Sequence, residues 1–345
     1  MITENTNIEA FAIHIVGSKA EDEGYSLSKS VMDVDDEMKE VLRDYFLSSF
    51  KSDELYNFYH DSELSYNEVC DYVGKIFDDS SQLFEQSVNL TKHLYEKSSH
   101  PNIKSGEFYV VLFRDCEVEG EIVDAVGLFK SENKDTFLKV KRDGENFCIE
   151  CDRGINPRKM DKGCIVFNHE RENGFVVKVI DNTNHTEAHY WTDDFLHIRQ
   201  RQDKYYNTQN VMSMYKNFVT KEMPQQFEMS KADQADLLNR SVKFFKENEN
   251  FEMQNFEDSV IQQPEVIQQF QTFKDTFSRE NDFEIPESFD ISDSAVKKQS
   301  RAFKSVIKLD KNFHIYVHAN PDYIEKGFDE HKGLKFYKLF FSNEE

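Results

Sequence analysis

Glycine and proline are scarce in this chain, and their scarcity limits the folds that it can adopt. The 345 residues include 12 Gly and 6 Pro, so these two types make up roughly 5% of the chain, against roughly 12% in an ordinary protein. Gly and Pro supply most tight turns. Collagen-like and glycine-rich linker architectures are therefore excluded, and long helices joined by few loops are favoured.

The rest of the composition indicates a globular protein with an aromatic core. Apolar residues make up 38% of the chain, with 31 Phe and 15 Tyr, and a chain of this length typically forms about two domains. No run of roughly 20 apolar residues, the length that spans a bilayer, is present. The N-terminus lacks the basic start of a secretory signal. Five scattered Cys are typical of reduced thiols, so we expect a cytoplasmic protein without membrane contact.

The middle of the chain has the pattern of consecutive strands. Turn signals at 118–120 and 142–144 separate short segments rich in β-branched and aromatic residues. Strands that follow one another without intervening helices predict an antiparallel sheet. The expected strands are 8–16, 25–32, 108–113, 122–130, 136–140, 147–151, 163–168 and 174–180.

Helical spacing of apolar residues flanks this strand-rich region. Ser230 and Asp233 mark one helix start, because the first can cap the helix and the second lies near its positive end. The pattern predicts a hairpin near the C-terminus, 305–309 with 313–318, and a strand at 335–341. The expected helices are 33–50, 66–96, 204–220, 231–247, 265–279 and 292–303.

Together these elements predict the α+β class. The expected organisation is an α+β domain with an antiparallel sheet and long helices at 1–188. A mainly helical domain with C-terminal strands follows at 189–345. The boundary is placed near 184–191, where sheet gives way to helix.

The charge of the chain is strongly negative but unevenly spread. Lys and Arg number 42 and Asp and Glu 65, which gives −23. The first 40 residues hold ten acids and three lysines, whereas 297–311 holds six cations and one acid. Clustered cations are typical of a phosphate-binding surface. A solvated surface, or a patch paired with the protein's own acids, explains them equally. The six cations are Lys297, Lys298, Arg301, Lys304, Lys308 and Lys311.

The presentation of these cations depends on where the helix ends. If it continues through Lys308, four of the cations form one stripe along the helix. If it ends near Phe303, Lys304 and Lys308 share a strand face instead. A weaker second cluster, Arg199, Arg201 and Lys204, precedes Tyr205 and Tyr206. Cations beside aromatic rings suit nucleic acid, but a helix that docks its tyrosines explains that cluster as well.

Sequence signatures of common enzymes are missing. Neither the glycine-rich phosphate loops nor the G-x-S-x-G and H-E-x-x-H motifs occur. Cys148 and Cys151 have C-x-x-C spacing, but no second pair follows, and a strand would point them to opposite faces. His185 and His189 could join His197 around a metal, although solvated loop histidines are the simpler reading. No catalytic residue, metal ligand or cofactor is therefore predicted.

Four stretches of the sequence resemble one known family. Residues 100–113, 161–168, 191–196 and 294–307 are similar, in order and length, to the bacterial nucleoid-associated proteins of about 37 kilodaltons. The likeness covers nearly the whole chain. It implies an α+β protein of the cytoplasm, found with the nucleoid, and brings no catalytic residues to transfer.

Two functions are compatible with these observations. In the first, a non-enzymatic nucleoid-associated protein contacts DNA non-specifically, and the six cations of 297–311 neutralise phosphates without reading bases. Arg199, Arg201 and Lys204 would form a second contact. In the second, an acidic interaction protein binds a DNA-handling protein without touching DNA itself. A symmetric dimer is the commonest default assembly.

Overall fold

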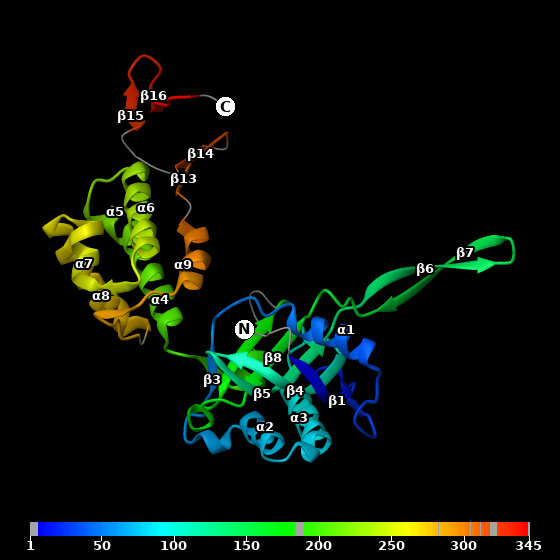
Figure 1. Cartoon of the computed structure of the whole chain (residues 1–345). Coiled ribbons are helices and arrows are strands. Elements are labelled where there is room, and N and C mark those ends of the chain that lie inside the picture. Colours follow the sequence, from blue (N-terminus) through cyan, green and yellow to red (C-terminus); the bar gives the residue numbers. More distant parts are fainter. Residues whose placement is uncertain are drawn as a thin grey trace. The chain divides into compact units, whose positions relative to one another are not determined.

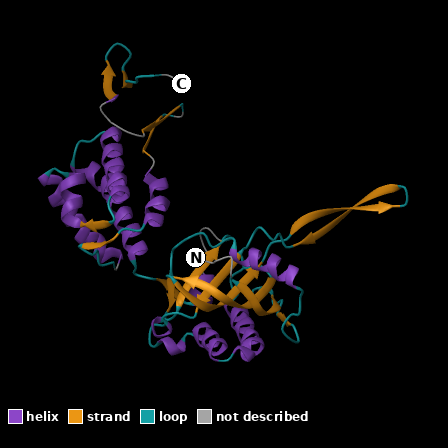
Figure 2. Ribbon diagram, viewed as in Figure 1, coloured by secondary structure: helices purple, strands orange, loops and turns teal. Residues whose placement is uncertain are grey.

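The computed structural model describes residues 6–183, 190–281, 283–303, 305–310, 312–317 and 323–343. The chain divides into two compact units, residues 1–201 and 202–345 (Figure 1). The first unit is a large antiparallel sheet with helices, and the second is mainly helical with small C-terminal sheets (Figure 2). The predicted α+β class is confirmed.

The first unit is built on an eight-stranded sheet in which every adjacent pair of strands is antiparallel. The strand order is β10-β3-β9-β8-β5-β4-β1-β2. The bounds are β1 Asn7–Val16, β2 Tyr25–Leu27, β3 Tyr56–Phe58, β4 Gly106–Val118, β5 Glu121–Ser131, β8 Lys162–Phe167, β9 Val176–Asp181 and β10 Ile198–Gln200.

Helices cover both faces of this sheet (Figure 2). Because side chains alternate along a strand, Phe108, Val110 and Leu112 of β4 pack in one core cluster with α2 and α3. Their neighbours Tyr109 and Val111 pack with α1 in the other. This double burial explains the unbroken apolar run along β4. The helices are α1 Asp36–Leu47, α2 Glu68–Asp78 and α3 Leu83–Lys97.

The prediction of a single helix over 66–96 is wrong, because the helix is interrupted at Asp79. The backbone of Asp79 is extended, and its side chain accepts hydrogen bonds from the Ser81 backbone N–H at 3.0 Å and from the Ser81 hydroxyl at 2.7 Å. Asp79 thus ends α2 and caps a 3₁₀ turn, Ser80–Gln82, that leads into α3. Local capping of this kind competes with a continuous helix.

A long hairpin leaves the sheet between β5 and β8. Its strands, β6 (Asp135–Asp143) and β7 (Asn146–Gly154), pair with each other in a separate two-stranded sheet. Figure 1 shows the hairpin reaching well beyond the eight-stranded sheet. We call this hairpin the β6–β7 arm. The two strands predicted here are confirmed and are longer than expected.

The second unit packs its helices around an aromatic core. The ring of Tyr215 lies 4.9 Å from the ring of Phe256 and 5.8 Å from that of Phe270, both edge-on. Helix α6 begins at Ser230, which caps it as predicted, and Asp233 bonds back to the Ser230 N–H, so that the two residues form a capping box. The helices are α4 Lys204–Asn217, α5 Met223–Gln226, α6 Lys231–Glu247, α7 Met253–Phe256, α8 Pro264–Asn281 and α9 Asp293–Ser300.

Three small sheets complete this unit. The hairpin β13–β14 has the predicted position, while β11, β12 and β15 were not predicted. No helix within the described ranges is long and apolar enough to cross a bilayer. The strands are β11 Asn250–Glu252, β12 Ser288–Asp290, β13 Ser305–Leu309, β14 Phe313–Val317, β15 Ile324–Asp329 and β16 Leu334–Leu339.

Single helical turns occupy several of the connections in both units. Those of 3₁₀ type are Leu64–Tyr66, Ser80–Gln82, Arg171–Asn173 and Arg301–Phe303. The π-helical turns are Tyr190–Leu196, Phe218–Glu222 and Glu257–Ile261.

Residues 190–200, which lead to the second unit, pack within the first unit. Trp191 is fully buried in the core cluster of α2 and α3, and β10 pairs with β3. The predicted domain boundary lies between residues 188 and 189, before this segment, whereas the compact units meet between residues 201 and 202. The apolar side chains of 190–198 account for the difference.

Asn67 offers a test of how this linking segment is held. Its buried side-chain amide donates to the carbonyls of Tyr59, Leu196 and His197 at 3.0–3.1 Å, and its carbonyl oxygen caps α2 through the Cys70 N–H at 2.9 Å. We expect Asn67→Ala to lower the free energy of unfolding by about 2–4 kcal/mol, because it removes the cap of α2 and the side-chain donor to the carbonyls of Tyr59 and Leu196. Urea denaturation measures this loss.

The exposed Ser65→Ala is the matched control, and it should change the stability by less than about 0.5 kcal/mol. An equal effect of the two substitutions would contradict the role given to Asn67.

Candidate functional site

Helix α9 presents its cations to solvent because its other side is buried. Ser292 caps the helix by accepting from the Ala295 N–H, and the Ser292 N–H donates to the Thr208 hydroxyl of α4 at 3.0 Å. Ala295 and Val296 are buried, and α4 and α9 pack together. The opposite side of the helix must therefore face outward.

Three of the predicted cations lie on this outward side. Lys297, Lys298 and Arg301 are exposed, and we call them the α9 surface. Both lysines lie in the last turn of α9, where positive charge is favoured by the helix dipole. Among the described residues no ion pair involves Lys297 or Arg301, so these two charges are open to a ligand.

Helix α4 brings a further cation to the α9 surface. The ammonium group of Lys298 lies 5.5 Å from the centre of the Tyr205 ring, within the range of a cation–π contact. Tyr205 lies in the first turn of α4, directly after the exposed Lys204. Lys204 thus directly precedes a residue that contacts the α9 surface, although its place in the sequence had grouped it with Arg199 and Arg201.

The remaining cations of the predicted strip have different positions. The helix ends at Ser300 and a 3₁₀ turn, Arg301–Phe303, follows, so a continuous helical stripe through Lys308 is excluded. Lys308 lies in β13, paired with His314 of β14. Lys304 and Lys311 lie outside the described residues.

Arg201 is engaged by acids of its own unit. Its guanidinium donates to the carboxylates of Glu119 at 2.7 Å and Glu170 at 2.8 Å, and 21% of its side chain is exposed. These carboxylates would compete with a phosphate. The exposed Arg199 lies with its guanidinium 5.6 Å from the centre of the Tyr59 ring.

The tyrosines beside this second cluster serve packing. Tyr205 is buried, and the ring of Tyr206 meets that of Phe283 edge-on at 5.2 Å. Docking of helix α4 therefore explains both of these aromatic residues.

The candidate metal ligands of the sequence are not brought together in the described residues. His185 and His189 lie outside those residues, and the His197 ring packs against that of Tyr59 at 4.4 Å. Cys148 is half-buried and Cys151 exposed, three residues apart on β7 and so on opposite faces.

One other group of possible ligands occurs, formed by Glu119, His169 and Glu170. Their ligand atoms lie within 4.8 Å of one another. The guanidinium of Arg201 already supplies positive charge to both carboxylates.

A buried ionic network, which the sequence analysis missed, lies where β5, β8 and β9 meet. The side chains of Lys130 and Lys162 are fully buried. Lys130 pairs with Glu132 at 3.0 Å, and Lys162 pairs with both carboxylate oxygens of Asp181 at 2.8 Å. The ring of Tyr190 lies 5.6 Å from the first ammonium group and 5.2 Å from the second.

Burial dominates the electrostatics of this network. It lowers the pKa of Lys130, against the opposing pull of the Glu132 carboxylate. Burial, reinforced by Glu132, raises the pKa of Tyr190, whose hydroxyl donates to Glu132 at 2.9 Å. The signal in the sequence is a lysine at one end of each of two apolar runs, Lys130 after residues 125–129 of β5 and Lys162 before residues 163–167 of β8. Both runs are buried on both faces, so no solvent-facing side exists.

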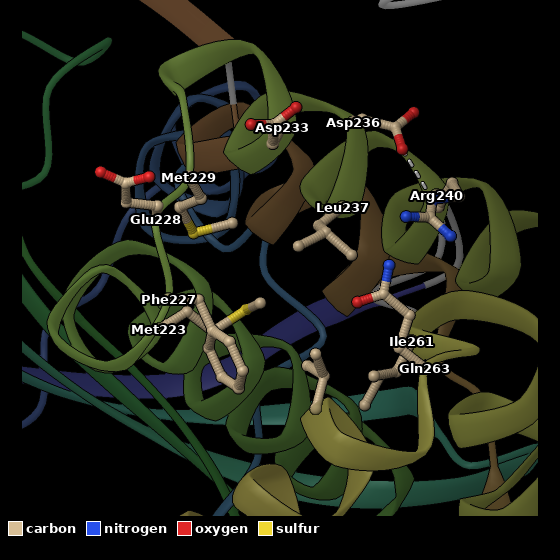
Figure 3. Close-up of a pocket in the computed structure, with 11 residues that line it drawn as sticks. Met223, Phe227, Glu228, Met229, Asp233, Asp236, Leu237, Arg240, Ile261 and Gln263 are labelled. Atoms are coloured by element: carbon tan, nitrogen blue, oxygen red, sulfur yellow. Dashed lines mark ion pairs between the residues drawn. The ribbon is translucent and has the colours of Figure 1, made fainter.

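A pocket opens in the second unit, between α5, α6 and the segment that precedes α8 (Figure 3). Its volume is about 320 Å³. Apolar side chains such as those of Met223, Phe227 and Leu237 line it, together with the carboxylates of Glu228, Asp233 and Asp236. Asp236 pairs with Arg240 at 2.9 Å, so the pocket is apolar with an excess of negative charge.

The fold and these sites define a class: an acidic α+β protein with an exposed cationic helix and a buried ionic network. The chain belongs to the nucleoid-associated protein YejK family, whose model matches residues 12–331. This match confirms the family resemblance seen in the sequence and extends over both units. A search of curated proteins found no match.

The pair of Lys130 and Glu132 yields a stability test. We expect Lys130→Met to destabilise the first unit by about 3–5 kcal/mol, because Glu132 stays buried without its counter-charge. The double variant Lys130→Met with Glu132→Gln should recover more than half of this loss, since the glutamine is neutral and still accepts from Tyr190. Chemical denaturation measures both.

As a control, Lys75→Met breaks an ion pair with Asp71 in which each side chain is nearly half exposed. It should cost less than about 1 kcal/mol. A double variant as unstable as the single one would show that charge burial is not the cause.

Proposed function

We propose that this chain is a non-enzymatic nucleoid-associated protein that contacts DNA through the α9 surface. The family supplies the association with the nucleoid. The observation that supports the contact is the exposure of Lys297, Lys298 and Arg301 together, with Lys204 beside them. Ammonium and guanidinium groups bind phosphate oxygens, and such contacts carry no base sequence information. The binding is therefore non-specific.

The distribution of charge favours the second unit as the contact. Residues 1–201 hold 23 Lys and Arg against 40 Asp and Glu, a charge of −17. Residues 202–345 hold 19 against 25, a charge of −6. Repulsion of DNA thus comes mainly from the first unit, and salt screens it over roughly 8 Å at physiological ionic strength. A local cationic surface on the less acidic unit can bind under these conditions.

DNA binding can be measured by the fluorescence anisotropy of a labelled random duplex at several salt concentrations. Three to four phosphate contacts predict that log K falls against log salt with a slope of about −3. Lys297→Gln with Arg301→Gln should weaken binding and make the slope shallower by about 2.

The matched control is Lys243→Gln with Lys246→Gln, which removes the same charge from exposed positions on α6. It should leave both the affinity and the slope nearly unchanged. Equal losses of affinity in the two double variants would show that binding depends on the net charge of the protein and not on the α9 surface. The absence of binding by the wild type at low salt would overturn the proposal.

A second function is favoured by the pocket of Figure 3. An apolar cavity with an excess of carboxylates suits an apolar side chain that is followed by a cation, as occurs in basic segments of DNA-handling proteins. In this alternative the chain binds such a protein without touching DNA.

Pull-down from a nuclease-treated lysate separates the two functions. Contacts bridged by DNA vanish, whereas capture through the pocket persists and is lost in Glu228→Lys, which reverses an exposed charge of the pocket. Capture that Lys297→Gln with Arg301→Gln abolishes would favour the α9 surface instead.

A further inference from the structure

The β6–β7 arm has one apolar face that the described part of the chain leaves uncovered. In an antiparallel pair, residues opposite each other project to the same side. The register pairs Val140 with Ile149, Leu138 with Cys151, and Arg142 with Phe147. These residues therefore share one face. Its four large apolar side chains are 66–73% exposed: Leu138, Val140, Phe147 and Ile149.

The other face of the arm carries charged, solvent-exposed side chains. Lys139 pairs with Asp152 at 2.6 Å and Lys141 with Glu150 at 2.5 Å, and all four side chains are about half exposed. Cross-strand ion pairs of this kind stabilise a solvated sheet face. The arm is thus amphipathic, although in the described structure it packs against no other sheet.

The uncovered face is large for a two-stranded hairpin. An isolated two-stranded hairpin is at best marginally stable in water and gains stability from a further layer. Each of the four side chains carries roughly 100 Å² of apolar surface, about 400 Å² in all. This is about the size of the largest apolar patch on a typical monomer, and such patches are often functional.

We propose that the apolar face of the arm is a self-association surface, where the arms of two copies of this chain pack face to face. Charge supports a second copy as the occupant. Residues 135–154 hold four Lys and Arg against five Asp and Glu, whereas the rest of residues 1–201 carries −16. Two strongly acidic molecules repel each other least where their surfaces are nearly neutral.

The charged side chains at the ends of the arm are divided between its two faces. Arg142 and Arg153 lie at opposite ends of the apolar face, whereas Asp143 lies on the other face and Glu145 in the turn. The acidic residues of the tip make a poor fit for DNA, although a two-stranded ribbon can enter the major groove.

The area sets the strength of the association. Two faces of about 400 Å² bury about 800 Å², below the roughly 1,200 Å² of stable complexes. The dimer is therefore weak and forms in a concentration-dependent way.

Sedimentation velocity of the full-length protein over a wide concentration range tests the proposal. The wild type should pass from monomer to dimer. Val140→Thr with Ile149→Thr keeps β-branched side chains and charge, so the arm stays folded. It should weaken the dimer about tenfold or more, because each lost apolar contact occurs twice.

Ile122→Thr is the matched control, since Ile122 is a β-branched strand residue that is 73% exposed outside the arm. It should leave the dimer unchanged. The two thiols of β7 supply a second measurement. Maleimide labelling of Cys151, which shares the apolar face, should slow several-fold at high protein concentration, while labelling of Cys148 on the other face should not change.

Three results would overturn the proposal. They are a monomer at every concentration, a dimer that Val140→Thr with Ile149→Thr does not weaken, and equal labelling of Cys151 at low and high concentration. Loss of DNA binding in that double variant of a purely monomeric protein would instead assign the face to DNA. Each result is independent of whether the α9 surface binds phosphate.

Discussion

The burial of the central strands on both faces is the constraint on which the first unit depends. In β4, alternate residues such as Phe108 and Tyr109 enter different core clusters, one beneath α2 and α3 and one beneath α1. A strand so enclosed has no solvent side for a charged residue. The lysines at the ends of two neighbouring strands, Lys130 and Lys162, are therefore buried. Their charges are tolerated there because Glu132 and Asp181 pair with them. The β6–β7 arm lies outside both layers, and four of its large apolar side chains therefore stay exposed on one face.

A second constraint is the excess of acids, which neutralises many cations before any ligand can. In the first unit, Arg171 pairs with Asp78, and Arg201 pairs with both Glu119 and Glu170. A cation is available to a phosphate only where the chain places no carboxylate beside it. Among the described residues, Lys297 of α9 and Arg301 of the 3₁₀ turn after it form no ion pair, although Asp293 lies one turn before Lys297. In an acidic protein, the absence of nearby acids is therefore more informative than the number of cations.

The sequence predicted those elements whose signals are local. Helix α6 matches its predicted bounds because the capping box of Ser230 and Asp233 fixes its start, and the hairpin β13–β14 follows from its turn and its alternating side chains. The three-residue strands β3, β10, β11 and β12 escaped prediction, since so short a strand exists only through its partner. The neutralisation of Arg201 was equally hidden, because Glu119 lies 82 residues away along the chain. The cationic side of α9 was predictable, since it needs only helical periodicity and a cap.

The proposed phosphate contacts and the proposed dimer contact are each weak, and their affinities would reinforce each other. The three or four phosphate contacts proposed for the α9 surface would give modest, salt-sensitive binding, and the proposed arm surface of about 400 Å² per copy would give a weak dimer. A dimer that holds two α9 surfaces lets the second engage the same duplex as an intramolecular event, which raises the overall affinity without any new type of contact. Local protein concentration along DNA would in turn favour dimer formation. For a chain of charge −23, such mutual reinforcement would permit stable association with DNA where the proposed contacts of a single molecule would hold it only weakly.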